Sequence, residues 1–135
     1  MLCAMTELLG FHHVAITVTN RDTSADWYAT VLGFEELFRE EGDDRRACVM
    51  RFPGGATGVG LVEFRGGDQT PFDPTRLGLD HLAFTVASLE ELEQWAARLS
   101  AAGVAHSGAI EIPPGAILNF KDPDGIALAL FWDHG

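Results

Sequence analysis

An internal repeat constrains the fold of this chain more than any other feature of its sequence. The segment that begins at His13 and the segment that begins at His81 match at one constant offset. The identities in this register include the pairs His13/His81, Ala15/Ala83, Thr17/Thr85, Val18/Val86 and Trp27/Trp95. Identities at a single offset that include the rare residue types His and Trp indicate that half of a domain has been duplicated.

Each half shows the same order of elements. A short apolar run rich in Val, Ile, Phe and Thr, at 11–18 and again at 79–86, predicts a strand. A helix follows in each half, because Asn20 and Ser88 are capping residues before helical patterns and Gly33 ends the first pattern. Strand-like runs separated by turn residues complete each half, at 34–40, 47–52, 59–64, 104–112, 116–120 and 126–132. The sequence therefore predicts the order β-α-β-β-β twice, in an α+β fold.

The length of 135 residues and an apolar fraction of 47% suit one compact domain with a buried core. We expect a single domain over 1–135, with modules at about 11–65 and 79–133. Residues 66–78 are rich in Gly, Pro and Asp and lack periodicity, so we expect a linker that borders a pocket. Cys48 lies in an alternating run and is expected to be a reduced core residue.

The charge balance argues against two classes of partner. Nine basic residues face twenty acidic ones, for a net charge of −11 at pH 7, and this balance repels phosphate backbones and anionic lipids. No apolar run approaches the ~20 residues that a membrane helix needs. The start of the chain, MLCAMTELLGF, lacks the basic region of a signal peptide. We therefore expect no nucleic-acid or membrane partner and a cytoplasmic location.

Three motifs resemble those of one protein superfamily. They are His-His-Val-Ala-Ile at 12–16 with Val-Leu-Gly-Phe at 31–34, Asp-His-Leu-Ala-Phe at 80–84, and Asn-Phe-Lys-Asp-Pro-Asp-Gly at 119–125. In this order they resemble the vicinal oxygen chelate superfamily, which includes glyoxalases, bleomycin-resistance proteins and extradiol dioxygenases. The resemblance spans nearly the whole chain, from about Phe11 to Trp132.

The resemblance implies a fold and a type of ligand site. The two modules would form a curled, cup-like mixed sheet with the helices outside, and the protein would be a homodimer with a small-molecule ligand. In metal-dependent members the cup holds a divalent ion (Zn, Ni, Mn, Co or Fe), bound by side chains from the first and last strand of each module. The bleomycin-binding members keep the cup without the metal.

The resemblance assigns metal ligands in this chain. His13 and His81 stand at matching places on the first strands. On the last strand of the first module the ligand is Glu63, a carboxylate on an otherwise apolar strand and also the candidate catalytic group for proton transfer. An exposed Glu63 paired with Arg65 is the alternative. In the second module, the count from the Asp-Pro-Asp-Gly turn places Ala129 where the family has glutamate, so the fourth ligand is missing.

Further residues lie on strands that would border the cup and are candidates for substrate contacts: Arg51, Asn119, Phe120 and Phe131. Two functions stay open. The first is a metal-dependent lyase or isomerase that acts on a small oxygen-rich molecule; a dioxygenase is disfavoured because Ala129 stands where its carboxylate is expected. The alternative is a metal-free binding protein of the bleomycin-resistance kind. Ala129 and the net charge favour the binding protein, whereas His13, His81 and Glu63 favour the enzyme.

Overall fold

The computed structural model of the chain describes residues 5–134, so residues 1–4 and 135 of the predicted domain lie outside the described part. The elements are β1 (Val14–Thr17), α1 (Arg21–Leu32), β2 (Glu35–Glu41), β3 (Arg45–Arg51), β4 (Thr57–Phe64), β5 (Leu82–Thr85), α2 (Leu89–Ala101), β6 (Ile110–Ile112), β7 (Gly115–Lys121) and β8 (Ala127–Asp133). The predicted order β-α-β-β-β occurs twice.

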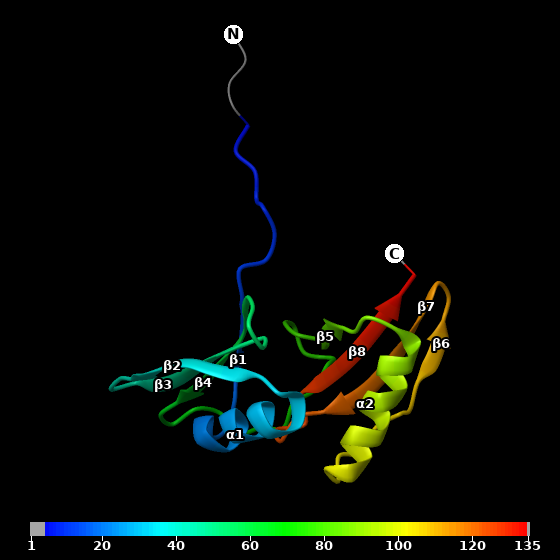
Figure 1. Ribbon diagram of the computed structural model, residues 1–135. Coiled ribbons are helices and arrows are strands. Elements are labelled where there is room, and N and C mark those ends of the chain that lie inside the picture. The colour runs from blue at the N-terminus through cyan, green and yellow to red at the C-terminus, as the bar shows by residue number, and fades with distance from the viewer. Residues whose placement is uncertain (1–4, 135) are drawn as a thin grey trace.

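The strands form two four-stranded mixed sheets with the same topology (Figure 1). The strand order is β1-β4-β3-β2 in the first sheet and β5-β8-β7-β6 in the second. In each sheet the first strand of the module runs parallel to the last, and the other neighbours are antiparallel. The α+β fold of two βαβββ modules is confirmed. Within the described residues the cup-like sheet consists of two sheets, so β1 and β5 are both edge strands.

The helices begin and end where the sequence predicts. The Asn20 side chain accepts a hydrogen bond from the Thr23 backbone N–H, and Ser88 does the same for Glu91 at the start of α2. Gly33 ends α1 in the left-handed region, at a φ of 80°, which glycine adopts without a steric penalty. Neither α1 nor α2, the helices of the described part, is long and apolar enough to cross a membrane.

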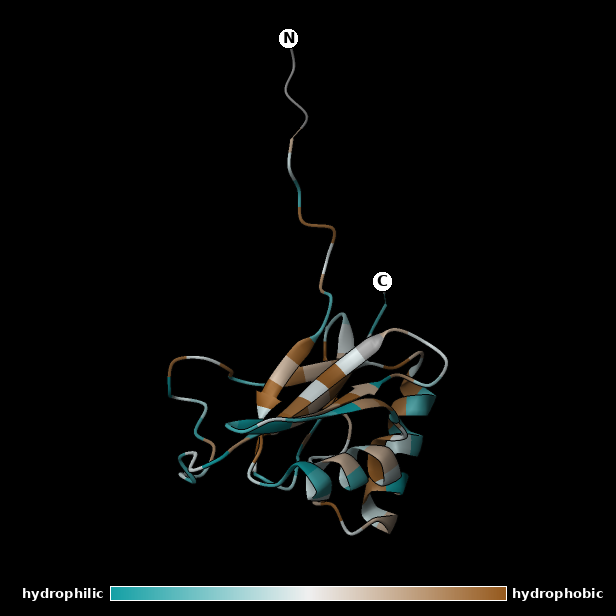
Figure 2. Cartoon of the chain, turned by 90° about the vertical axis from the view of Figure 1, so that its left-hand side faces the viewer, coloured by the Kyte–Doolittle hydropathy of each residue, from teal (hydrophilic) through white to brown (hydrophobic). Residues whose placement is uncertain are grey.

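One face of each sheet is covered by the helix of its own module, and we call the opposite face the helix-free face. Because side chains alternate along a strand, every second residue points toward the helix. These residues form a shared hydrophobic core that includes Ile16, Cys48, Leu61, Leu118 and Leu128. Cys48 is fully buried, as predicted, and burial raises the pKa of its thiol to about 12. In Figure 2 apolar residues run along the strands.

The predicted strand over 104–112 differs from the structure. A strand was expected over 104–112, but β6 comprises only Ile110–Ile112, and His106 forms an isolated bridge to Phe120. Between them Gly108 has a φ of 70°, which turns the backbone out of the extended conformation. The chain therefore bends between two short contacts with β7.

The modules pack together through their helix-covered sides. The Tyr28 hydroxyl of α1 is fully buried and donates a hydrogen bond of 2.9 Å to Asp122, in the turn before β8. Asp122 also accepts hydrogen bonds from two backbone N–H groups of its own turn. Burial and the charge of Asp122 raise the pKa of Tyr28, so its hydroxyl stays protonated. Aromatic contacts across the same junction join Trp27 to Phe120 and Phe34 to Phe84.

Tyr28→Phe is expected to lower the free energy of unfolding by about 1–2 kcal/mol, because the buried Asp122 carboxyl loses a hydrogen-bond donor. Urea unfolding followed by circular dichroism measures the change. Thr30→Ala is the control, since it removes an exposed hydroxyl hydrogen bond within α1 and is expected to change little. Equal effects of the two variants would contradict the importance of the Tyr28–Asp122 contact.

Candidate functional site

The histidines of the repeat, His13 and His81, lie at equivalent positions on the helix-free faces of the two sheets. His13 precedes β1, and alternation places it on the helix-free side with Ala15 and Thr17, which are exposed. His81 precedes β5 in the same way, and Ala83, the next residue on its side of that strand, is also exposed. The predicted equivalence of His13 and His81 thus follows from the fold.

The sheet register corrects the expected match between the last strands. Ala83 on β5 pairs with Ala129 on β8, and its repeat partner Ala15 pairs with Gly60 on β4. Gly60 is therefore the counterpart of Ala129, and the predicted counterpart, Glu63, is wrong. The match to Glu63 assumed that the first module is two residues longer here, whereas the structure shows that the chain from Ala15 to Gly60 is one residue shorter than that from Ala83 to Ala129.

Glu63 lies on the helix-covered side of β4 and stabilises the start of α1. Its Oε1 accepts a hydrogen bond of 2.8 Å from the backbone N–H of Arg21, the first residue of α1, and is 3.0 Å from a guanidinium nitrogen of Arg46. The hydrogen bond from Arg21 and the contact with Arg46 lower the pKa of Glu63. A carboxylate at a helix N-terminus is stabilising. The metal-binding and catalytic roles of Glu63 stay predictions that these contacts do not support, and its ion-pair partner is Arg46 in place of the alternative, Arg65.

His81 is oriented by the residue before it. Its Nδ1 is 2.7 Å from a carboxylate oxygen of Asp80, so in the neutral ring Nδ1 carries the proton and donates it. The Nε2 atom of His81 then has a free lone pair. This arrangement prepares an imidazole to accept a hydrogen bond or to bind a metal.

His13 contacts the neighbouring imidazole. Its Nδ1 is 2.8 Å from Nδ1 of His12, and the rings meet edge to face with centroids 5.0 Å apart. One of the two Nδ1 atoms donates and the other accepts, which fixes complementary tautomers in the pair when both rings are neutral.

The donor set for a metal is incomplete. On the last strands, Gly60 and Ala129 pair with Ala15 and Ala83, two residues after His13 and His81, and neither has a side-chain donor atom. Among residues 5–134, no group of three or more His, Cys, Asp or Glu side chains is arranged to hold a metal ion. The side chains present therefore do not fit a divalent ion held by two histidines and two carboxylates.

A hollow of about 880 Å³ brings together three of the predicted site residues, His81, Asn119 and Phe120. Asn119 is exposed on the helix-free face of β7, whereas the Phe120 ring is buried beside Trp27 and contributes a wall. His106 also lines the hollow. Its Nδ1 accepts a hydrogen bond from the Gly108 N–H, so its Nε2 carries the proton and donates it to Ser100, and the neutral ring does not act as a base on that hydroxyl.

The other two predicted contact residues lie elsewhere. Arg51 pairs with Glu35 at 3.0 Å, at the end of β3 farthest from the start of α1. Phe131 is half-buried on the helix-free face of β8, where it pairs with Thr85. A substrate-binding role for both residues stays a prediction.

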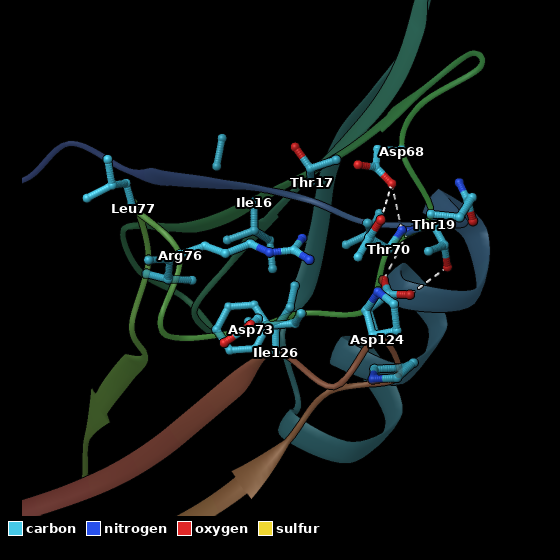
Figure 3. A pocket seen from close by; sticks show the side chains of 17 residues that line it. Ile16, Thr17, Thr19, Asp68, Thr70, Asp73, Arg76, Leu77, Asp124 and Ile126 are labelled. Atoms are coloured by element: carbon cyan, nitrogen blue, oxygen red, sulfur yellow. Dashed lines mark hydrogen bonds between the residues drawn. The ribbon is translucent and has the colours of Figure 1, made fainter.

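A second hollow, of about 560 Å³, lies between β1 and the linker, which borders a pocket as predicted (Figure 3). The Arg76 side chain extends from the linker toward Ile16, over an apolar wall. Asp68 and Asp73 line the same hollow. Hydrogen bonds from neighbouring threonines lower the pKa values of both carboxyl groups, and the charge of Arg76 adds a smaller effect in the same direction. No sequence pattern indicated a role for Arg76, because a lone arginine in a loop has no distinguishing pattern.

Comparisons with known proteins agree with this architecture. The family model described as Glyoxalase/Bleomycin resistance protein/Dioxygenase superfamily matches residues 10–130. A solved glyoxylase/bleomycin resistance protein/dioxygenase domain from Frankia sp. EAN1pec is 41% identical, with a TM-score of 0.88 over 95% of this chain and 100% of that chain. The uncharacterized protein YaeR of Escherichia coli (strain K12) is 30% identical over 94% of this chain and 98% of its own length.

One relative has a name that describes an activity. The putative ring-cleaving dioxygenase MhqA of Bacillus subtilis (strain 168) is 31% identical over 92% of this chain. The matching region covers 40% of MhqA, so most of that protein has no counterpart here.

Glu63→Gln is expected to lower the free energy of unfolding by about 1 kcal/mol near neutral pH, because the amide keeps an acceptor for α1 but loses the charge. The pKa of Glu63 lies below its ordinary value of 4.5 in the folded protein. The contribution of the charge is therefore present above that value and is lost as the pH falls through the folded pKa.

Urea unfolding near neutral pH and at about pH 3 measures this difference. The control is Glu93→Gln on the exposed side of α2, for which no change is expected. A Glu63→Gln variant as stable as the parent near neutral pH would refute the assignment of Glu63 to the start of α1.

Proposed function

This chain belongs to the glyoxalase/bleomycin resistance protein/dioxygenase superfamily, and we propose that it binds a small molecule on the helix-free faces of its sheets. In this proposal no carboxylate side chain holds a metal at the site. The observation that carries it is the pair Gly60 and Ala129, which lie beside Ala15 and Ala83 on the same faces as the histidines. Residues without donor atoms at both places favour direct contact between ligand and protein.

The shape of the faces supports a ligand with an apolar body. Ala15, Gly60, Ala83 and Ala129 form a floor of small residues in the two sheets. A Cβ atom added to Gly60 would lie 3.3 Å from the Cβ of Ala15, so even a methyl group would crowd this floor. Small-molecule sites are concave and mostly apolar with a few polar groups, and a floor of small side chains leaves room for a ligand in such a hollow.

The polar groups at the margin are His81 and Asn119. His81 Nε2 is left free by the Asp80 contact, and the Asn119 side chain lies in the same hollow. These groups would orient the ligand through hydrogen bonds, while the apolar floor would supply most of the binding energy.

We also propose that the protein is a homodimer. In the part of the chain that the structure describes, β1 and β5 belong to separate sheets, and neither of the two hollows described above contains residues of both helix-free floors. A second copy that places its β5 beside β1 would bring His13 of one copy near His81 of the other. A cytoplasmic location, with no nucleic-acid or membrane partner, remains a proposal consistent with the net charge of −11.

A metal-dependent lyase or isomerase is the second candidate function. The observation in its favour is the Asp80–His81 contact, which resembles the carboxylate–histidine pairs found at metal sites. In the homodimer, His13 and His81 would supply donor atoms from equivalent positions of the repeat, whereas Glu63 is engaged at the start of α1. Such an enzyme would need its remaining ligands from water or from the substrate itself.

Ala83→Leu is expected to abolish ligand binding, because the larger side chain fills the space above the floor. A thermal-shift screen of small aromatic and cationic molecules identifies ligands, and titration calorimetry then compares the variants. Ala97→Leu, at an exposed position of α2, is the matched control and is expected to bind as the parent does. Binding that survives Ala83→Leu would place the ligand elsewhere.

Elemental mass spectrometry on protein purified without a histidine tag separates the two candidates. We expect well below one metal ion per chain, also after incubation with Zn, Ni, Mn, Co or Fe(II), because the proposed site offers His13 and His81 but no carboxylate side chain. Near-stoichiometric metal that is lost in both His13→Ala and His81→Ala would instead establish a metal site and favour the enzyme.

A further inference from the structure

Polar side chains border β8, the strand between β5 and β7, on the helix-free face of the second sheet (Figure 1). On β7, Asn119 pairs with Ala129 and Lys121 pairs with Ala127. On the other side, His81 immediately precedes β5, whose first residue pairs with the residue after Ala127, so His81 lies at the level of Ala127. Because alternate residues of a strand share a face, these polar groups face one another across a floor of two alanines. All of them except Ala129 line the hollow of about 880 Å³.

The β7 margin of this floor offers a positive charge and hydrogen-bond donors. Lys121 is the only lysine of the chain. Its side chain is exposed, and among residues 5–134 its ammonium group forms no ion pair. The neighbouring Asp122 is buried on the helix-covered side, where it accepts the hydrogen bond from Tyr28. An ammonium group has only donors, and the Asn119 amide adds another, so this margin fits a carboxylate.

The β5 margin has the opposite character. The Asp80 carboxylate is 2.7 Å from Nδ1 of His81, which leaves Nε2 of the neutral ring as a hydrogen-bond acceptor. Asp80 lines the same hollow and adds a negative charge behind the imidazole. A ligand group that donates a hydrogen bond and carries a positive charge, such as an ammonium group, suits this margin. Across the floor, the site is therefore positive at β7 and negative at β5.

We propose that the site takes a small zwitterion with an apolar body, whose carboxylate binds Lys121 and Asn119 and whose ammonium group binds His81. The strands that carry the two margins are two spacings apart, about 10 Å, a gap that the Lys121 side chain and a ligand of amino-acid size span together. The inference rests on the proposed function and names its ligand class. All of these groups belong to one chain, so the inference does not depend on the homodimer.

The rest of the lining and the net charge favour the same ligand class. Trp27, Val104 and Ile117 contribute apolar walls to the hollow, and the two alanines of the floor leave room for an aromatic or aliphatic body. The net charge of −11 repels a ligand that is only an anion. A ligand that is only a cation leaves Lys121 without a partner and places a like charge near it. A zwitterion avoids both penalties.

Titration calorimetry with three related probes tests the charge pattern in the parent protein. L-Phenylalanine carries both charges, 3-phenylpropionate lacks the ammonium group, and phenethylamine lacks the carboxylate. We expect L-phenylalanine to bind about tenfold or more tightly than either analogue, because each analogue loses a charge-assisted hydrogen bond. An analogue that binds as tightly as L-phenylalanine, or no binding of L-phenylalanine at millimolar concentration, would overturn the proposal.

Lys121→Met keeps the length of the side chain and removes its charge. We expect the affinity for L-phenylalanine to fall about tenfold or more, whereas the affinity for phenethylamine does not fall. The matched control is Arg65→Met, which removes an exposed cation of the first module and should bind both probes as the parent does. An unchanged affinity for L-phenylalanine in Lys121→Met, or an equal loss in the control, would refute the role of Lys121.

The single lysine also allows the contact to be observed directly. Reductive methylation with ¹³C-formaldehyde labels Lys121 and the N-terminal amine and keeps their charge, and Lys121→Met assigns the two signals. We expect L-phenylalanine to shift the Lys121 signal, and an unshifted signal in the bound protein would contradict the contact. Binding of L-phenylalanine that persists in Ala83→Leu would refute the ligand site of the proposed function itself. Binding that Ala83→Leu abolishes and Lys121→Met leaves intact would refute only the zwitterion.

Discussion

The buried hydrogen bond from Tyr28 to Asp122 joins α1 of the first module to the turn before β8 of the second, and the arrangement of both sheets depends on it. A buried carboxyl needs its hydrogen bonds, so this contact sets how the modules meet. Since they meet through their helix-covered sides, the helix-free faces and the edges of β1 and β5 stay open. The positions available to a ligand and to a second copy both follow from this packing.

Strand alternation then decides which residues belong to the ligand site. Gly60 faces away from α1, whereas Glu63, an odd number of residues later, faces toward it. Ala83 lies beside Ala129 on the helix-free face of the second sheet. Alternation therefore leaves small residues at the site, while the Glu63 carboxylate points away from it. Small residues at both carboxylate positions support the proposal that the site binds its ligand without a metal.

The sequence predicted much of the fold because its signals are local and repeated. The His13/His81 register, the caps Asn20 and Ser88, and the alternating apolar residues each determine nearby backbone geometry. The predicted match of Glu63 to Ala129 was wrong because a lone carboxylate on an apolar strand is compatible with two roles, a metal ligand and an anion at a helix N-terminus. The two roles of Glu63 are distinguished by the register in which β1 pairs with β4. This register depends on contacts between residues that are distant in the sequence. The Tyr28–Asp122 contact and the hollow around Arg76 arise from the same kind of long-range packing, so no local pattern reveals them.

The most direct test of the ligand site is methyl NMR spectroscopy of alanine-labelled protein, titrated with a ligand found by thermal-shift screening. The account predicts chemical-shift changes at Ala15 and Ala83, which are exposed on the helix-free faces. It predicts little change at Ala25 and Ala116, which are buried in the helix-covered core. Changes confined to the core alanines, or to the exposed Ala97 of α2, would contradict a ligand site on the helix-free faces.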